Sequence, residues 1–516
     1  MRIFDTYVQK LKYKVLTELA RQTWVGNDAF SVFNDIANQV VKKGEPTMSC
    51  CIYKDRAIVA ERIRIALGGK KEDHNVIQVI DIACDECPVA GHVVTDLCRG
   101  CVAHACVDAC KLGAITVDSH QKAEIDKSKC VECGKCAKSC PYSAIANFKR
   151  PCERACKVDA ISMAPDGVAQ IDSEKCIECG ACVYKCPFGA TLDVSSITDI
   201  IKTIVDSDDN KNYHVHAIVA PAIAGQFQYA KAGQLISAIR ELGFYAVEEV
   251  ALGADIVAYK EAQELQEKGF LTSSCCPAFV KYIKMKFPQL AEHISHNLSP
   301  MAETGKLIKE QDPDAKIVFI GPCTAKKGEV RKPEVHQYVD YVMTFEELQA
   351  MIDSKDIAVD QLPETELDTA TYYGRVFART GGLSEAVTEA VREQKAAAEA
   401  AKADVPDGAG TSGAVASGEA GTNSGKPASG DGACDGDSAD SKPFVFDPIV
   451  CDGIDSCKTA LLRASKGLLP NNFIEGMVCT DGCIGGAACL SHGNADKRAI
   501  DNYGKKATHK EIRDVL

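Results

Sequence analysis

Cysteine is the residue type that dominates the possible chemistry of this chain. The sequence has 27 cysteines among 516 residues, and most of them stand in short-spaced groups. In a small secreted protein such a count would indicate disulfides. In a long chain whose N-terminus lacks the charged-then-apolar order of a signal peptide, metal binding is the better interpretation. We therefore expect a metal-binding protein, located by default in the cytoplasm.

Two regular cysteine motifs give the strongest signal. Each follows the spacing C-x2-C-x2-C-x3-C and is followed by a proline. This spacing suits a 4Fe-4S cube, because three thiolates on a tight loop reach one cluster while the fourth ligates the other cluster of a pair. A zinc site would instead need C-x2-C pairs separated by longer loops. The motifs consist of Cys130, Cys133, Cys136 and Cys140, and of Cys176, Cys179, Cys182 and Cys186.

A second, less regular set of cysteines lies in the same block. Its members carry tails similar to those of the regular motifs, which indicates an internal repeat. We hypothesise two further 4Fe-4S clusters, although a structural zinc or free thiols are the alternative for Cys84 and Cys87. The predicted ligands are Cys98, Cys101, Cys106 and Cys156 for one cluster, and Cys84, Cys87, Cys152 and Cys110 for the other.

Three cysteine motifs further along the chain could meet at one metal centre. They lie in the stretches 272–277, 321–327 and 477–483. The first holds the adjacent pair Cys275 and Cys276. Neighbouring side chains on an extended segment point in different directions, so one sulfur can bind a metal while the other faces whatever lies beside it. The motifs thus offer one unligated thiol and four ligand sulfurs, from Cys276, Cys323, Cys479 and Cys483.

The segments around these motifs alternate between strand and helix patterns. Such alternation is typical of α/β architecture with parallel strands, whose ligands lie just past the carboxyl ends of strands. Cys276 and Cys323 occupy such positions. The predicted strands are 215–220, 246–250 and 316–320, and the predicted helices are 235–242, 256–268 and 279–287.

The three motifs and the cysteine block that precedes them resemble the iron-only (FeFe) hydrogenases, over roughly residues 81–490. In that family a 4Fe-4S cube is joined to a diiron unit that carries carbon monoxide, cyanide and an azadithiolate bridge; together they form the H-cluster. The resemblance implies that Cys276, Cys323, Cys479 and Cys483 hold the cube, and that Cys483 also bridges to the diiron unit.

The resemblance also assigns roles around that cofactor. Cys275 aligns with the cysteine that passes protons to the bridging amine, and Lys326 with the lysine that hydrogen-bonds a cyanide. Met477 aligns with a methionine packed against the diiron unit, and Glu329 with a glutamate that orders the second motif. Lys327, the neighbour of Lys326, is interpreted as a surface lysine.

A proton relay is also implied, because heterolytic cleavage of dihydrogen releases a proton in a pocket that excludes water. Glu261 and Glu264 share one helical face and resemble the relay carboxylates, with Ser295 as the hydroxyl between them. Taken alone, each carboxylate could be a solvated helix residue, and Ser295 could be a helix cap.

The chain departs from the family pattern at several positions, which suggests a divergent subgroup of monomeric hydrogenases. Gly321 stands where well-studied members have a methionine, and Ala278-Phe279 replaces the common Gly-Trp. Structural thiols are the preferred interpretation of Cys451, Cys457 and Cys489, with an additional cluster or a redox-sensing role as alternatives.

Composition and the resemblance together predict the domain organisation. The fold class is an α/β catalytic domain, with two parallel-sheet lobes around the active-site cluster, preceded by α+β ferredoxin-like modules and a small helical N-terminal region. Residues 393–442 are rich in Ala, Gly, Ser and Asp, which predicts a disordered insertion that contains an incidental thiol, Cys434. The predicted boundaries are 1–80, 81–194, 195–392 with 443–516, and 393–442.

The net charge of −13 argues against a nucleic-acid or anionic-membrane partner, and no apolar run is long enough to span a membrane. The resemblance implies reversible dihydrogen oxidation and proton reduction, with electrons relayed to a soluble carrier such as ferredoxin. It also implies hydrogenase maturation proteins as partners, and oxygen sensitivity. The alternative is a non-catalytic relative that assembles iron–sulfur clusters or senses redox state or dihydrogen. A pure electron-transfer polyferredoxin would leave the long α/β region without a purpose.

Overall fold

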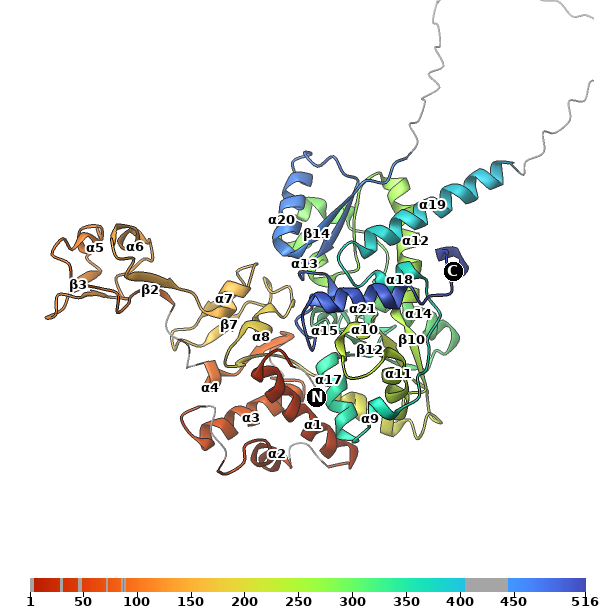
Figure 1. Ribbon diagram of the computed structural model, residues 1–516, viewed down its shortest axis with the longest axis horizontal. Helices are drawn as coiled ribbons and strands as arrows, with labels where there is room; N and C mark the ends of the chain where they lie inside the picture. Colours follow the sequence, from red (N-terminus) through yellow and green to blue (C-terminus); the bar gives the residue numbers. More distant parts are fainter. Residues whose placement is uncertain are drawn as a thin grey trace, which may run out of the picture.

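The computed structural model describes residues 4–27, 31–44, 49–70, 73–84, 87, 90–403 and 444–516. A helical N-terminal region, two small modules of short strands and helices, and a larger α/β region follow one another along the chain (Figure 1). Within the described residues, no helix combines the length and the apolar character needed to cross a membrane.

The N-terminal region consists of α1 (Tyr7–Trp24), α2 (Phe33–Val40) and α3 (Ile52–Ala66). Thr6 begins α1 with a capping box, because its hydroxyl accepts from the backbone N–H of Gln9 and the Gln9 side chain accepts in return. The apolar side chains Leu11, Val15 and Leu19, spaced three to four residues apart along α1, are buried. They pack the helix against α9 (Ile197–Asp206) and α17 (Phe345–Ser354) of the α/β region.

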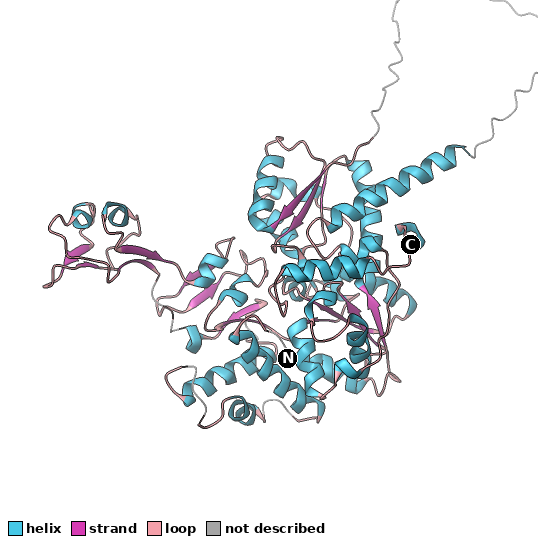
Figure 2. Cartoon of the chain, viewed as in Figure 1, coloured by secondary structure: helices cyan, strands magenta, loops and turns pink. Residues whose placement is uncertain are grey.

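The cysteine block folds into two modules, each built from short antiparallel strand pairs (Figure 2). The module with α5 (Ala105–Asp108) and α6 (Lys135–Ser139) projects away from the rest of the molecule (Figure 1). The module with α7 (Pro151–Ala155) and α8 (Ala181–Lys185) lies next to the α/β region. The strand pairs are β2 (Gly91–Val94) with β5 (Ile145–Phe148), β3 (Ile115–Val117) with β4 (Ala123–Ile125), and β6 (Ile161–Met163) with β7 (Ala169–Ile171).

One further strand pair shifts the predicted boundary at residue 80. β1 (Ile77–Val79) pairs with β8 (Thr191–Asp193), and α4 (Asp81–Cys84) follows β1 directly. The sheet that closes the cysteine block therefore begins a few residues earlier than the sequence pattern suggested.

The α/β region contains two parallel sheets, which confirms the predicted parallel α/β architecture. One sheet has the order β10 (Ala246–Glu249), β9 (Val215–Val219), β12 (Lys316–Gly321) and β13 (Tyr341–Thr344). The other has the order β11 (Leu271–Thr272), β15 (Phe473–Met477) and β14 (Pro448–Asp452). Every residue of β9 and of β15 is buried, as expected for strands covered on both faces.

Helices cover both sheets. They include α10 (Ile223–Gln226), α11 (Ala232–Glu241), α12 (Val250–Lys268), α13 (Pro277–Lys286), α14 (Pro300–Gln311), α15 (Ala325–Glu329), α16 (Pro333–His336), α18 (Tyr372–Val376), α19 (Gly382–Ala403), α20 (Gly453–Ala464) and α21 (Asn494–Gly504). α19 corrects one predicted boundary: residues 393–403 of the expected disordered insertion are helical, because the Glu- and Ala-rich sequence favours a helix. The remainder of that stretch, with Cys434, lies outside the described residues.

A buried charge network fixes the N-terminal region to the elements behind the second cysteine motif. Lys12 of α1 contacts Asp193 of β8 at 2.6 Å and Glu346 of α17 at 2.7 Å. Lys327 of α15 contacts the second oxygen of Asp193 and also Glu347, both at 2.8 Å. The interpretation of Lys327 as a surface lysine is therefore wrong, because Asp193 and Glu347 provide the partners that allow its ammonium to be buried.

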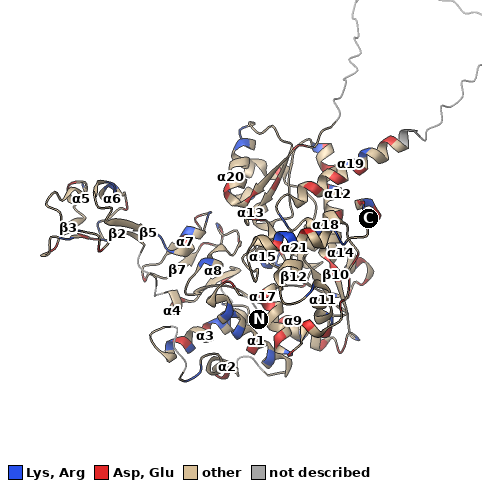
Figure 3. Ribbon diagram, in the orientation of Figure 1, with Lys and Arg blue, Asp and Glu red and all other residues tan. Residues whose placement is uncertain are grey.

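Elsewhere, Lys and Arg residues are interspersed with Asp and Glu residues along the helices (Figure 3). Burial alone would raise the pKa of Asp193, but the two ammonium groups outweigh it and hold that pKa below its usual range.

We expect Lys12→Met to destabilise the protein by about 3–5 kcal/mol, because it leaves Glu346 as a buried carboxylate without its ammonium partner. Denaturant unfolding followed by the fluorescence of Trp24, the single tryptophan, measures the change where α1 meets α17. Lys10→Met, at an exposed position of the same helix, is the matched control and should stay within about 0.5 kcal/mol of the wild type. Equal effects of the two substitutions would contradict the assigned role of the network.

Candidate functional site

Loops that follow strands of both sheets bring four predicted ligand cysteines together. Cys276 follows β11, Cys323 follows β12, and Cys479 and Cys483 follow β15. β11 and β15 are adjacent parallel strands, with Thr272 opposite Ile474, so their carboxyl ends lie at one edge. Burial raises the pKa of Cys483 to about 12, and the neighbouring Cys323 and Cys276 add to the increase. Cys323 and Cys276 are also neighbours of Cys479, together with Cys483 itself.

This donor set fits a thiolate-bound metal centre. Burial and the charges of the other cysteines disfavour ionisation of the four thiols, whereas coordination to iron deprotonates a thiol and neutralises its charge. The sulfurs are also spaced too widely for a single zinc ion. Within the described residues, the one group of at least three metal-binding side chains with ligand atoms all within 4.8 Å contains no cysteine. Zinc thiolates need sulfurs less than about 4 Å apart.

Cys275 lies beside this set as a buried fifth sulfur. Burial raises the pKa of its thiol well above the usual value, and the charges of Glu261, Cys276 and Cys483 act in the same direction. Its neighbours therefore include two of the candidate ligand cysteines, Cys276 and Cys483, and the carboxylate of Glu261.

The first carboxylate of the predicted relay, Glu261, is a neighbour of Cys275, and Ser295 connects it to the second, Glu264. Glu261 of α12 is fully buried, and its Oε1 accepts from the Ser274 backbone N–H at 3.2 Å. Burial raises the pKa of Glu261 to about 7. The Ser295 hydroxyl donates to Glu264 Oε2 at 3.1 Å. A hydrogen bond between Ser295 and Glu261 offsets a part of the increase that burial causes in the pKa of Glu261. The structure thus brings together all the residues proposed for the relay.

Glu264 connects this line to the surface. Its carboxylate accepts from Lys268 at 2.7 Å and from Asn297 at 2.9 Å, and it lies 2.6 Å from Nδ1 of His296. The side chain of His296 is 70% exposed. These donors outweigh the burial of Glu264 and lower its pKa, whereas burial raises the pKa of Glu261.

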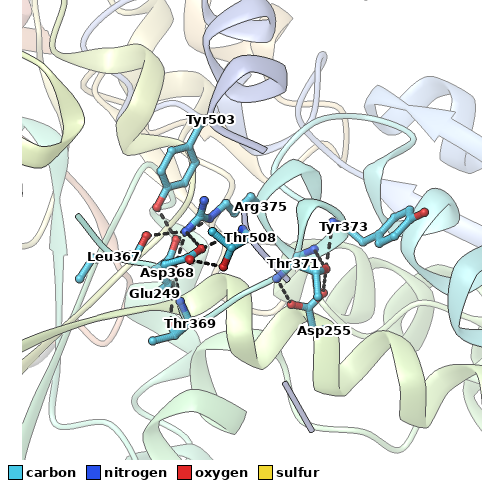
Figure 4. Close-up of polar contacts among 11 residues, drawn as sticks. Glu249, Asp255, Leu367, Asp368, Thr369, Thr371, Tyr373, Arg375, Tyr503 and Thr508 are labelled. Atoms are coloured by element: carbon cyan, nitrogen blue, oxygen red, sulfur yellow. Dashed lines mark hydrogen bonds and ion pairs between the residues drawn. The ribbon is translucent and has the colours of Figure 1, made fainter. Parts of the chain in front are cut away.

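A buried polar cluster fixes the first turns of α12, which carries both carboxylates (Figure 4). Glu249, the residue before α12, accepts from Arg375 Nε at 2.8 Å and from the hydroxyl of Tyr503. Asp255 accepts from the Thr371 hydroxyl at 2.7 Å, and burial raises its pKa to about 7. The cluster joins α12 to α18 and α21, so it holds the helix in position against the cysteine loops.

Lys326 is buried at the ligand loop, as its predicted role requires. Its ammonium contacts Glu329 at 2.5 Å. Burial would lower the pKa of Lys326, but Glu329, Cys323 and Cys275 outweigh it and raise that pKa. The ammonium thus stays charged beside the cysteines, and Glu329 positions it there.

Met477, which matches the family pattern, is buried at the end of β15. At two positions that depart from that pattern, aromatic rings fill the space. A Cβ at Gly321 would lie 2.6 Å from the ring of Phe319, so Phe319 occupies the space that a larger side chain at position 321 would need. Phe279 similarly lies against Gly476, where a Cβ would approach its ring to 2.2 Å.

The structure corrects the predicted grouping of the accessory ligands. Cys140, not Cys156, lines a small cavity with Cys98, Cys101 and Cys106. Cys156 is instead a close neighbour of Cys182. The physical reason is that each irregular motif folds with the regular motif that follows it in one module, so the fourth cysteine of each motif crosses to the other cluster of its own module. The sequence prediction instead pairs the two irregular motifs with each other.

The remaining cysteines show the same exchange of the fourth cysteine between the two clusters of a module. Burial raises the pKa of Cys152 to about 11, and Cys186, Cys84 and Cys87 add to the increase. Cys110 packs in one apolar cluster with Cys136. The four sets are Cys98, Cys101, Cys106 and Cys140; Cys110, Cys130, Cys133 and Cys136; Cys156, Cys176, Cys179 and Cys182; and Cys84, Cys87, Cys152 and Cys186.

The set around Cys156 lies directly beside the candidate site. A cavity of about 980 Å³ is lined by Cys156, Cys176, Cys179 and Cys182 and also by Cys479. The Thr324 hydroxyl donates to the backbone carbonyl of Glu178 at 2.7 Å, which ties the two loops together. Electrons could therefore pass between an accessory cluster here and the candidate centre over a short path.

Sequence reasoning missed one buried acid at the site. Glu475 of β15 accepts from the backbone N–H of Gly381 at 2.7 Å and of Ser384 at 2.8 Å, and it contributes to the raised pKa of Cys275. An acidic residue inside an apolar strand, two positions before Met477, was the available signal. Cys457 and Cys489 are buried and donate to backbone carbonyls, Cys457 to that of Met477.

Comparison with known proteins adds independent information. A model of the iron only hydrogenase large subunit, C-terminal domain, matches residues 213–487, and a 4Fe-4S dicluster domain model matches residues 97–144 and 150–190. Iron hydrogenase 1 of Clostridium pasteurianum is 30% identical over 308 residues, which cover 54% of this chain and 52% of the relative. The periplasmic Fe hydrogenase large subunit of Nitratidesulfovibrio vulgaris is 29% identical over 278 residues, which cover 49% of this chain and 61% of the relative.

A shorter match is to a protein named for iron–sulfur cluster assembly. The cytosolic Fe-S cluster assembly factor NAR1 of Kluyveromyces lactis is 37% identical over 95 residues, which cover 18% of this chain and 20% of that protein. Among solved structures, a variant of the FeFe-hydrogenase HydA1 from Chlamydomonas reinhardtii aligns with a TM-score of 0.46 and 20% identity, over 62% of this chain and 92% of that chain. The present chain spans about half the length of the hydrogenase relatives that it matches.

Proposed function

Because the chain belongs to the iron-only hydrogenase large-subunit family and carries 4Fe-4S dicluster domains, we propose that it interconverts dihydrogen with protons and electrons. The electrons pass through the accessory clusters to a soluble carrier such as ferredoxin. Hydrogenase maturation proteins supply the diiron unit.

One observation carries this proposal: the buried thiol of Cys275 neighbours both Cys276 and Cys483 of the four-cysteine set and Glu261, the first group of the proposed proton route. An iron–sulfur protein that only assembles clusters or transfers electrons has no need of such a route. The route from Cys275 to Glu261, Ser295 and Glu264 ends among polar surface residues. Each of its groups can hold a proton.

The chain's own residues account for binding and proton transfer. Cys276, Cys323, Cys479 and Cys483 would hold the cube, and Cys483 would also connect it to the diiron unit. Lys326 donates from its buried ammonium to an anionic ligand of the cofactor, and Met477 closes the apolar side. When bound, the diiron unit supplies the centre at which dihydrogen is split heterolytically.

Cys275 takes the proton released at this centre and passes it to Glu261. A pKa of about 7 lets Glu261 both accept and release a proton near neutral pH. Glu264, with a lowered pKa, stays ionised and draws the proton outward through Ser295. Clusters held by the Cys156 set and by the cysteines of the projecting module would carry the electrons between this centre and the carrier.

The second candidate is a non-catalytic relative that assembles iron–sulfur clusters or senses redox state or dihydrogen. The match to the assembly factor NAR1 supports it. Such a protein needs the four cube ligands, Cys483 among them, but it does not need Cys275 or Lys326. Both are present here, and both are buried beside the ligands.

Infrared spectroscopy tests the proposal. After maturation with the diiron cofactor, the wild-type protein should show the bands of bound carbon monoxide and cyanide and should evolve dihydrogen. Cys483→Ala should lose both the bands and the activity, because the bridge to the diiron unit is gone. Cys457→Ala, at another buried cysteine, should keep the bands. Wild-type protein that never acquires the bands, although its 4Fe-4S clusters are full, would favour the second candidate.

A further inference from the structure

We propose a divalent metal site of the zinc type at the amino end of β9, formed by His214, His216 and Asp312. Within the described residues, these side chains form the one group of three whose ligand atoms all lie within 4.8 Å. His214 Nδ1 lies 2.7 Å from Asp312 Oδ2, and His216 Nε2 lies 3.9 Å from the same oxygen. Two imidazoles and a carboxylate, with a fourth position left to water, form a ligand set that suits zinc.

The backbone prepares the two histidines for a common ligand. Residues two apart on an extended segment point to the same face, and His214 and His216 have this spacing at the start of a central strand. Neighbouring strands hold the segment on both sides: Lys316 N–H donates to the His214 carbonyl and Tyr245 N–H to the Val215 carbonyl, each at 2.8 Å. The imidazoles therefore have little freedom to separate.

His216 has the environment of a metal ligand. Its Nδ1 lies 2.8 Å from Glu248 Oε1, so the carboxylate fixes the ring and leaves Nε2 toward Asp312. His216 is 7% exposed, and its Nε2 has no hydrogen-bond partner in the described part of the chain. A histidine that donates one nitrogen to a carboxylate and offers the other to a metal is a recurrent arrangement in zinc proteins.

The geometry requires only small movements. Two ligand atoms of a tetrahedral zinc ion lie about 3.3 Å apart. This value falls between the 2.7 and 3.9 Å that separate Asp312 Oδ2 from the nitrogens of His214 and His216. The ring of His214 stacks on Tyr245 at a centroid distance of 3.8 Å, which limits its rotation. Its side chain is 40% exposed, so an ion and a water ligand can reach the site from solvent.

The site is separate from the hydrogenase centre proposed above. It lies at the amino end of the sheet, whereas Cys323 lies past the carboxyl end of the neighbouring strand β12. Asp312 is the C-cap residue directly after α14, and α14 packs against α12. A bound ion would therefore anchor the end of α14 to the central strand and stabilise the fold without touching the reacting groups.

Zinc K-edge X-ray absorption on the full-length holoprotein, with all 4Fe-4S sites filled and after dialysis from one equivalent of Zn²⁺, tests this site. We expect about one retained zinc per chain, with nitrogen and oxygen neighbours, and a higher melting temperature than zinc-free protein. Asp312→Asn and His214→Gln should each lower the retained zinc at least tenfold while dihydrogen turnover stays unchanged. His336→Gln, which removes an exposed imidazole elsewhere, is the matched control and should retain the zinc.

Two results would overturn the proposal. One is zinc retention that Asp312→Asn and His214→Gln leave unchanged. The other is a sulfur neighbour in the absorption spectrum, because it would place the ion at cysteines. Neither result depends on whether the protein turns over dihydrogen, so the site fails or stands independently of the proposed activity.

Discussion

Cys275→Ala is expected to lose dihydrogen turnover by a factor of about 10³ while keeping the carbon monoxide and cyanide bands. The substitution removes a thiol that ligates nothing in the proposed arrangement, so the cofactor should still bind. It breaks the proposed route between the cofactor and Glu261, the carboxylate whose charge acts most strongly on Cys275. Dihydrogen evolution and infrared spectra measured on the same sample separate the two effects.

Cys451→Ala is the matched control for this prediction, because Cys451 is also a buried thiol of the α/β region but belongs to a different apolar cluster. It should retain turnover. Loss of the bands in Cys275→Ala would show that the thiol is needed for cofactor binding, and unchanged turnover would show that protons leave by another route. Either outcome would remove the role assigned to Cys275.

The parts of this molecule that sequence predicts well are those governed by local spacing. Ligand spacing identified the accessory cysteines without any knowledge of the fold, because a cluster needs its thiolates on a tight loop. Strand periodicity identified β9, β10 and β12 within one residue of their observed ends. The relay candidates Glu261 and Glu264 came from the family resemblance and helical spacing, and the structure places Ser295 beside both.

Long-range partners could not be predicted in the same way. The exchange of Cys140 and Cys156 between modules depends on which motifs fold together, and a cysteine spacing does not state that. Lys327 looked like a surface residue because its partners, Asp193 and Glu347, come from distant parts of the chain. Burial of a charge is decided by tertiary contacts, so no pattern within the motif could have indicated it.

Glu261→Gln is expected to lower turnover by a factor of about 10³ and to change how stability depends on pH. The folded-state pKa of Glu261 is about 7, against an ordinary value of 4.5, so folded protein retains this proton where unfolded protein has lost it. Below pH 4.5 the group has no effect on stability. Between pH 4.5 and 7 it destabilises the fold increasingly as pH rises, by about 3 kcal/mol in full. Glutamine cannot ionise, so the variant should gain stability relative to the wild type as pH rises from 5 to 8.

Glu264→Gln provides the matched control, since this carboxylate has a lowered pKa and the opposite linkage. Its charge stabilises the fold above the unfolded pKa, so the glutamine variant should be less stable than the wild type at neutral pH, and the difference should shrink at acid pH. Melting temperatures of anaerobic holoprotein across this pH range compare the three proteins directly. A Glu261→Gln curve parallel to that of the wild type would mean that Glu261 is not buried in a protonated form. The relay would then lack the one group whose proton affinity matches neutral pH.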